Sequence, residues 1–130
     1  ETIIAKNAPD IVYTHHHSDL NVDHRIVHQA VLTAFRPTPA RQNATIYSFE
    51  VNSSTEWNTT NSLNSFTPTC FIDISQQINN KIELLKIYQA EMPNYPHARS
   101  IEAIEALAKS RGCSVGLPFA EAFMLIREIK

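Results

Sequence analysis

The sequence predicts an α/β layer fold with a largely parallel sheet. Short runs of β-branched and aromatic residues alternate with stretches of helical periodicity along the 130 residues. Hydrophobic residues make up 43% of the chain, which is enough to bury the core of one domain. When single helices connect successive strands, the strands of the sheet run parallel, and this order of elements therefore favours a parallel arrangement.

The strands are expected where β-branched and aromatic residues cluster between turn-forming residues. Four such segments are predicted: 11–14, 45–51, 70–74 and 120–126. Residues 52–67, between the second and third strands, are rich in Asn, Ser and Thr. A polar loop of this length inside a compact domain is usually functional.

The helices are expected over residues 23–35, 75–91 and 101–111, where apolar residues recur at helical spacing. Asn21, Ser75 and Ser100 precede these segments and are the residue types that cap helix N-termini. Gly112 follows the last segment and is predicted to be its left-handed C-cap.

The charge distribution argues against two classes of partner. The net charge is −2 with histidine neutral, and the basic residues form no long run, which disfavours nucleic acid as the main partner. No apolar run approaches the roughly 20 residues of a membrane span, and no signal segment opens the sequence. We therefore expect a cytoplasmic protein without a membrane span.

The most informative segment is 13–24, Tyr-Thr-His-His-His-Ser-Asp-Leu-Asn-Val-Asp-His. It holds four of the six histidines and two carboxylates, directly after the first predicted strand. Imidazole and carboxylate groups bind zinc at catalytic sites and move protons near neutral pH. Ligands of α/β sheets bind beyond the carboxyl ends of strands. The segment therefore predicts an active site.

The local pattern leaves two interpretations open. His24 and His28 lie one helical turn apart and could both bind a metal, but a catalytic zinc usually takes three protein ligands. Alternatively, Asn21 and Asp23 serve the helix N-terminus, and the histidines are surface or core residues. His28 is predicted to be a helix-face residue beside the site.

Several blocks together resemble the PIG-L/LmbE-like de-N-acetylases, which are zinc enzymes that remove acetyl from N-acetylglucosamine-type sugars. The blocks are 9–16, 19–25, 47–51, 53–57, 71–74, 96–103 and 120–123, so the resemblance covers nearly the whole chain. It implies a Rossmann-like three-layer α/β/α sandwich that binds Zn²⁺ and acts on an N-acetylated sugar or glycoconjugate.

The resemblance assigns roles to residues of the histidine segment. His24 matches the last histidine of the family's HxDH element, which binds the metal, and Asp23 matches the acidic residue that orients its neighbours. Asn21 stands where the family has the first histidine of this element. An amide can donate a hydrogen bond but cannot deliver a proton at neutral pH. His16, or His15 beside it, is expected to cover that role.

The family's His-Pro-Asp-Asp motif, which supplies the general base and two metal ligands, is absent from the 130 residues. Residues 1–130 are therefore expected to be the C-terminal portion of a single deacetylase domain. A missing N-terminal segment or a companion chain would carry the motif, and this chain alone is expected to be inactive. A homo-oligomer is also expected.

Three further residues are candidates for substrate contact. Glu56 and Trp57 lie in the polar loop, where an aromatic face could pack on a sugar ring, and Arg99 lies in a matched block. Trp57 could equally hold the loop or contact another subunit, and Arg99 could equally cap a helix or contact another subunit. Two alternatives to the deacetylase remain: a non-catalytic carbohydrate-binding or assembly module on the same scaffold, and an enzyme for another N-acyl amine.

Overall fold

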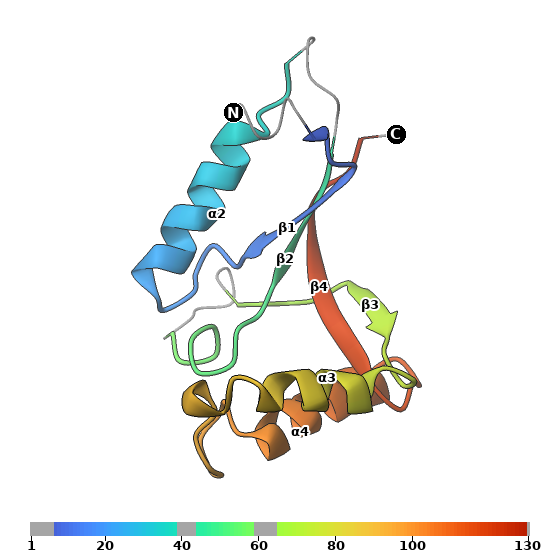
Figure 1. Ribbon diagram of the computed structural model, residues 1–130. Helices are drawn as coiled ribbons and strands as arrows, with labels where there is room; N and C mark the ends of the chain where they lie inside the picture. Colours follow the sequence, from blue (N-terminus) through green and yellow to red (C-terminus); the bar gives the residue numbers. More distant parts are fainter. Residues whose placement is uncertain (1–6, 39–43, 59–64, 130) are drawn as a thin grey trace. The chain divides into compact units, whose positions relative to one another are not determined.

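The computed structural model describes residues 7–38, 44–58 and 65–129, and these residues form a mixed α/β fold (Figure 1). The strands are β1 (Ile11–His15), β2 (Thr45–Phe49), β3 (Cys70–Asp73) and β4 (Ala120–Arg127). The α-helices are α2 (Val22–Ala34), α3 (Ile78–Lys86) and α4 (Ile101–Cys113), and a short 3₁₀ helix spans Gln89–Glu91. The α/β class is confirmed. None of the helices in the described part of the chain is long and apolar enough to cross a membrane.

The four strands are hydrogen-bonded in the order β1-β2-β4-β3, and the sheet is mixed. β1 and β2 are parallel, with His15 opposite Phe49, whereas β2 and β4 are antiparallel, with Phe49 opposite Phe123. β3 is antiparallel to β4. The Thr69 N–H before β3 donates to the Phe123 carbonyl, and the Ile74 N–H after β3 donates to the earlier Phe119 carbonyl. The prediction of a largely parallel sheet is therefore wrong for the described strands.

The connection between β3 and β4 departs from the single-helix connection of a parallel pair. β1 and β2 are joined through the single helix α2, which returns the chain so that the second strand runs in the same direction. β3 and β4 are separated by two helices, α3 and α4, which reverse the chain once more. The sequence predicts both helices of this connection. It does not predict the direction in which the chain re-enters the sheet after them.

The chain divides into two compact units, Glu1–Thr69 with Phe123–Lys130 and Cys70–Ala122. In the first unit, α2 packs against β1, and Figure 1 shows the helix alongside the β1–β2 pair. The Asn21 side chain accepts from the Asp23 backbone N–H at 2.9 Å, so the predicted N-cap of α2 is confirmed. Residues 59–64 of the predicted polar loop lie outside the described residues.

The second unit is built around an apolar cluster. α3 and α4 contact each other (Figure 1), and Ile74, Ile78 and Ala108 are buried between these elements, with Ile82 and Phe119 packed against them. α3 is shorter than predicted, because Ser75 bonds to the Asp73 carboxylate in a turn and Gln77 precedes the helix without a side-chain cap.

The prediction that Gly112 caps α4 is wrong, since this residue lies inside the helix. A Cβ atom at Gly112 would lie 2.6 Å from the Leu117 carbonyl oxygen and 2.9 Å from Phe119 Cα. Glycine is therefore required by the close approach of the following chain. The left-handed conformation falls on Gly116, whose φ is +76°.

Candidate functional site

The first unit brings His15 and His24 together at the carboxyl end of β1. His15 is the last residue of β1, and His24 lies in the first turn of α2. Their rings stack with centroids 4.0 Å apart and planes inclined by 20°. The Phe49 ring, at the end of the parallel neighbour β2, lies 4.8 Å from the His15 ring. Part of the histidine segment thus gathers where the sequence predicts a site.

Asp19 is the polar centre of this arrangement and is fully buried. Its Oδ1 accepts from the Ser54 hydroxyl and from the Asn21 backbone N–H, and its Oδ2 accepts from the Thr55 hydroxyl at 2.7 Å. Burial raises the pKa of the Asp19 carboxyl, but these hydrogen bonds and the neighbouring His24 outweigh it, so the pKa lies below its ordinary value. Asp19 is therefore an ionised carboxylate that only accepts.

This carboxylate lies beside the His24 ring. The His24 Nδ1 atom lies 3.0 Å from Asp19 Oδ1 in an ion-pair contact outside hydrogen-bond geometry, and the His24 side chain is 20% exposed. A carboxylate attracts an imidazole nitrogen only when that nitrogen carries a proton. With Nδ1 protonated in the neutral ring, the lone pair lies on Nε2, which is the form in which histidine binds a metal.

His16 is held in the other neutral tautomer, with its ring proton on Nε2. Its side chain is fully buried, and its Nδ1 lies 3.4 Å from the Ser18 backbone nitrogen and 3.0 Å from the Ser18 hydroxyl. A backbone N–H can only donate, so His16 Nδ1 accepts and the ring proton lies on Nε2. Burial, followed by the neighbouring His17 and His28, lowers the pKa of His16 to about 4. At neutral pH, His16 can donate a hydrogen bond but cannot act as a general acid.

Among the described residues, the Nε2 atom of His16 is one of several unpartnered polar atoms at this site, together with His15 Nδ1 and His24 Nδ1. It is buried, and no hydrogen-bond partner for it occurs among the residues that the structure describes. A buried donor without a partner is costly and is often found where a ligand binds. His16 therefore offers a preorganised neutral donor beside the His15–His24 stack.

His28 has a structural role at the same site. Its side chain is buried, and its Nδ1 lies 2.8 Å from the His15 carbonyl oxygen. Since a carbonyl oxygen only accepts, Nδ1 donates and ties α2 to the end of β1. Burial, followed by repulsion from His24, lowers the pKa of His15, which favours its neutral form. The predicted helix-face position of His28 is thus a buried one.

The predicted residues Asn21 and Asp23 lie at the N-terminus of α2. Asn21 caps the helix, and Asp23 is exposed. The carboxylate that contacts His24 is that of Asp19. A catalytic role for Asn21 or Asp23 stays a prediction.

The predicted substrate residues fall in both units. The Glu56 carboxylate accepts from the Ser53 and Ser54 backbone N–H groups at 2.6 and 3.3 Å and so closes the turn after β2, and the adjacent Trp57 is 52% exposed. Arg99 belongs to the second unit, where its guanidinium lies 3.7 Å from the Glu91 carboxylate. A substrate role for Arg99 stays a prediction.

No group of three His, Cys, Asp or Glu side chains arranged to hold a metal occurs within the described ranges 7–38, 44–58 and 65–129. His24 is the one residue of the segment whose orientation by a buried carboxylate fits a metal ligand. A zinc centre at His24 would therefore need further ligands from outside the described residues.

The sequence interpretation missed the roles of Asp19, Ser54 and Thr55. Asp19 was visible as one of two carboxylates in the segment, but nothing in the local spacing distinguishes it from Asp23. Ser54 and Thr55 lie 35 and 36 residues from Asp19 in sequence, and hydroxyl residues in a polar loop carry no signal of such a contact.

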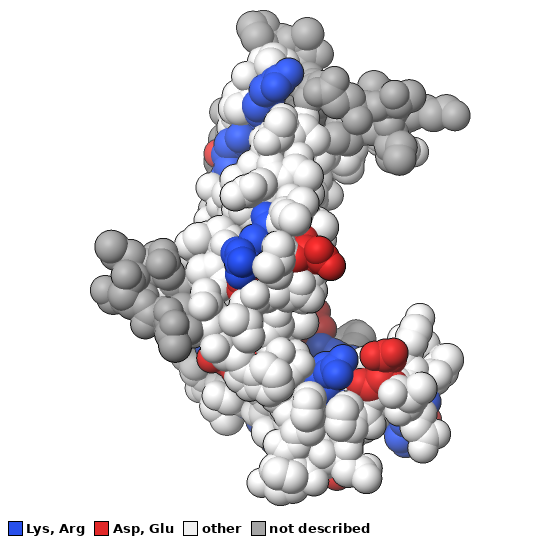
Figure 2. Space-filling view, turned by 90° about the vertical axis from the view of Figure 1, so that its left-hand side faces the viewer, with Lys and Arg blue, Asp and Glu red and all other residues white. Residues whose placement is uncertain are grey.

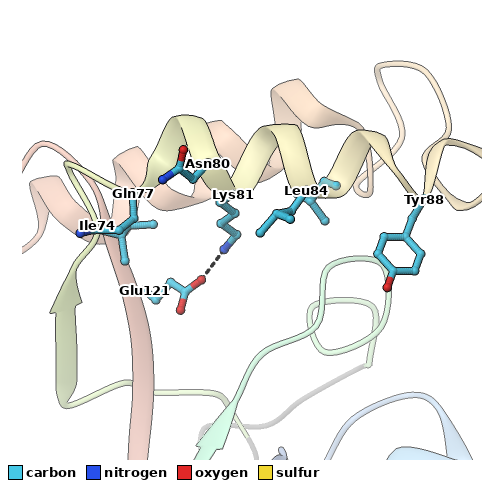
Figure 3. Close-up of a pocket in the computed structure, with 8 residues that line it drawn as sticks. Ile74, Gln77, Asn80, Lys81, Leu84, Tyr88 and Glu121 are labelled. Carbon is cyan, nitrogen blue, oxygen red and sulfur yellow. Dashed lines mark hydrogen bonds and ion pairs between the residues drawn. The ribbon is translucent and has the colours of Figure 1, made fainter.

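A pocket among the described residues lies wholly within the second unit (Figure 3). The pocket has a volume of about 460 Å³ and mainly apolar walls, which include Ile74, Leu84 and Tyr88. Figure 3 shows Lys81 reaching from α3 to Glu121 of β4, where the two charged groups are 2.5 Å apart. Among the described residues on the face shown in Figure 2, acidic and basic side chains are scattered and form no broad patch of one sign.

Neither a scan of family models nor a search of curated proteins finds a match to this chain. Among solved structures, the chain is similar to the conserved protein TT1542 from Thermus thermophilus, with a TM-score of 0.72 and 17% sequence identity. The similarity covers 98% of this chain and 56% of that protein. At this identity the match concerns the fold alone, and the chain spans little more than half of its structural neighbour.

Proposed function

We propose that this chain is part of a zinc-dependent hydrolase that removes acetyl from an N-acetylglucosamine-type sugar. The observation that supports the proposal is the pairing of His24 with the buried, ionised Asp19. Metal-binding histidines commonly donate their second ring nitrogen to a carboxylate, which fixes the ring and raises its basicity. The resemblance of the surrounding blocks to the PIG-L/LmbE-like de-N-acetylases gives this pairing its chemical context.

The donor set fits zinc in part. His24 would hold the ion through Nε2, and two further ligands and the general base would come from a segment or chain outside this sequence. A bound zinc ion would supply the Lewis acidity that amide hydrolysis requires. On its own, the chain is proposed to be inactive, because one oriented histidine is a poor zinc site.

His16 has the properties of an oxyanion donor. Its neutral ring presents a buried N–H at Nε2 and needs no rearrangement when negative charge develops on the acetyl oxygen. A preorganised donor of this kind contributes about 3–4 kcal/mol to transition-state stabilisation. Because His16 does not carry a second proton at neutral pH, the proton for the leaving amine would come from another group.

We also propose that the whole protein is a cytoplasmic, Rossmann-like three-layer α/β/α domain that forms homo-oligomers. The described sheet contains one parallel pair joined through a helix, which is the repeating unit of such folds. The remaining parallel strands would belong to the part of the protein outside this sequence.

The test is metal content and acetate release in the full-length protein that contains this chain. We expect about one zinc per chain and acetate release from N-acetylglucosamine derivatives. His24→Gln should lose the zinc and with it the turnover, because it removes the one ligand that this chain would supply and the reaction depends on the ion. The exposed neighbour variant His17→Gln is the matched control and should retain both. Full-length protein that binds zinc but releases no acetate from any acetylated sugar would refute the proposed reaction.

The alternative function is a non-catalytic carbohydrate-binding or assembly module. It is favoured by the absence of a three-ligand group among the described residues and by the use of Asn21 as a helix cap. Sugar binding by metal-free full-length protein, with no zinc taken up at His24, would support this alternative over the enzyme.

A further inference from the structure

We infer that Ser54 and Thr55 are positioning residues that, through Asp19, hold His24 in its metal-binding form. The inference rests on the proposed function in one respect, namely that His24 is a zinc ligand. It assigns a role to the turn after β2, where the sequence predicts Glu56 and Trp57 as candidates for substrate contact.

The turn at residues 51–58 is bonded directly to the loop that follows β1. The hydroxyls of Ser54 and Thr55 both donate to the Asp19 carboxylate. The Leu20 backbone N–H donates to the Ser54 carbonyl at 3.3 Å, and the Asn58 side-chain amide donates to the Ser18 carbonyl. The side chains of Ser54 and Thr55 are buried. The two segments thus form one connected layer over Asp19.

The direction of the Thr55 hydrogen bond is fixed by its second partner. The Val51 backbone N–H lies 2.7 Å from Thr55 Oγ1 and can only donate to it. The hydroxyl proton of Thr55 is therefore free to point at Asp19 Oδ2, 2.7 Å away. The Val51 N–H thus donates to Thr55, and Thr55 donates to Asp19, so the hydrogen bonds run in one direction from the turn backbone to the carboxylate.

The two hydroxyls hold the carboxylate in the orientation that His24 requires. Thr55 fixes Oδ2, and Ser54 and the Asn21 N–H fix Oδ1, the oxygen that lies 3.0 Å from His24 Nδ1. Without these hydroxyls, the carboxylate can turn away from Nδ1. The adjacent negative charge then no longer favours a proton on Nδ1, and in a neutral ring the proton can occupy Nε2, where it blocks the metal lone pair.

The test uses nitrogen NMR of the imidazole rings in the full-length protein without added metal, which distinguishes a proton on Nδ1 from one on Nε2. We expect the wild-type His24 ring to carry its proton on Nδ1. In Ser54→Ala/Thr55→Val the Nε2–H form should become the major one. Zinc chloride added to the same samples should bind about 10–100-fold more weakly in the double variant.

Three controls separate positioning from a general loss of structure. Thr55→Ser restores the hydroxyl and should restore the wild-type form of His24. Thr33→Val, which removes an exposed hydroxyl bonded to Gln29 on α2, and Ser114→Ala, which removes one bonded to Arg111, should leave His24 unchanged. If the double variant does not fold, the single variants Ser54→Ala and Thr55→Val are compared by the same NMR signal.

An unchanged His24 ring in folded variants that lack these hydroxyls would overturn the inference. Because the NMR measurement needs neither metal nor substrate, its outcome is independent of acetate release. A wild-type protein with the expected ring form but no deacetylase activity would refute the proposed reaction and leave the positioning role standing.

Discussion

The two units of this chain differ in what they bury. In the first unit, the fully buried side chains are mostly polar and include His16, Asp19 and Ser48. In the second unit, the buried cluster is apolar and consists of Ile74, Ile78 and Ala108. Burying polar groups is costly unless they are hydrogen-bonded, so the stability of the first unit depends on keeping these hydrogen bonds intact. The second unit gains its stability from packing.

The difference indicates where each unit is vulnerable. Removing one member of the polar network leaves its partners buried without hydrogen bonds, and the cost is that of desolvation. Changing a residue in the second unit alters volumes and close contacts instead. The following predictions test this contrast, beginning with the largest effect.

Asp19→Ala should destabilise the protein by about 3–5 kcal/mol, because it leaves two hydroxyls and a backbone N–H without their shared acceptor and removes the charge beside His24. Urea unfolding followed by circular dichroism measures the change. Asp23→Ala, which removes an exposed carboxylate from the first turn of α2, should cost less than about 1 kcal/mol. Similar losses in the two variants would contradict the central place of Asp19.

Gly112→Ala should cost about 1–3 kcal/mol through steric overlap in the second unit. The added Cβ would lie 2.6 Å from the Leu117 carbonyl oxygen, a contact that the backbone must shift to relieve. Gly116→Ala is the matched control: nothing lies within 4 Å of its added Cβ, and only its left-handed φ is strained, at a cost of about 1 kcal/mol. A larger loss at Gly116 would show that backbone conformation outweighs packing here.

Acidification should weaken the first unit between pH 6.5 and pH 4. His16 takes up its proton near 6.5 when unfolded but only at about 4 when folded, so the unfolded state binds more protons in this window. The free energy of unfolding should therefore fall as the pH falls, by at most about 1.4 kcal/mol per pH unit. The lowered pKa of His15 acts in the same direction.

Urea unfolding of metal-free protein at several pH values measures this dependence. His16→Asn should flatten it, whereas His17→Asn, which removes only the second cause of the lowered His16 pKa, should flatten it in part. An equal slope in wild type and His16→Asn would mean that another group governs the acid response.

Asn21→Ala should have the smallest effect, about 1 kcal/mol, through loss of the α2 N-cap. Asn21→Ser keeps a capping oxygen and should retain most of the stability. If Asn21 also donates to the substrate through its amide, Asn21→Ser should remain stable but lose acetate release in the full-length protein. Full activity of that variant would leave Asn21 with the capping role alone.

Much of the fold was predictable because it depends on local sequence. The four strands and the helix α2 were predicted to within about two residues from hydrophobic periodicity, and Asn21 and Ser100 were predicted as caps from residue type. Strand direction was not predictable in the same way, because it depends on how the α3–α4 connection returns to the sheet. The role of Gly112 was also missed, since it arises from a contact with Leu117 and not from backbone conformation.

For the site, the sequence by itself determined that imidazole and carboxylate groups gather after β1, since spacing along one short segment forces them together. Only the tertiary structure decided which groups act on which. It paired His24 with Asp19 and brought Ser54 and Thr55 to Asp19 from 35 and 36 residues away. The physical reason is that a buried carboxylate needs donors from every side, and the chain supplies them from segments whose proximity is set by the packing of β1 beside β2.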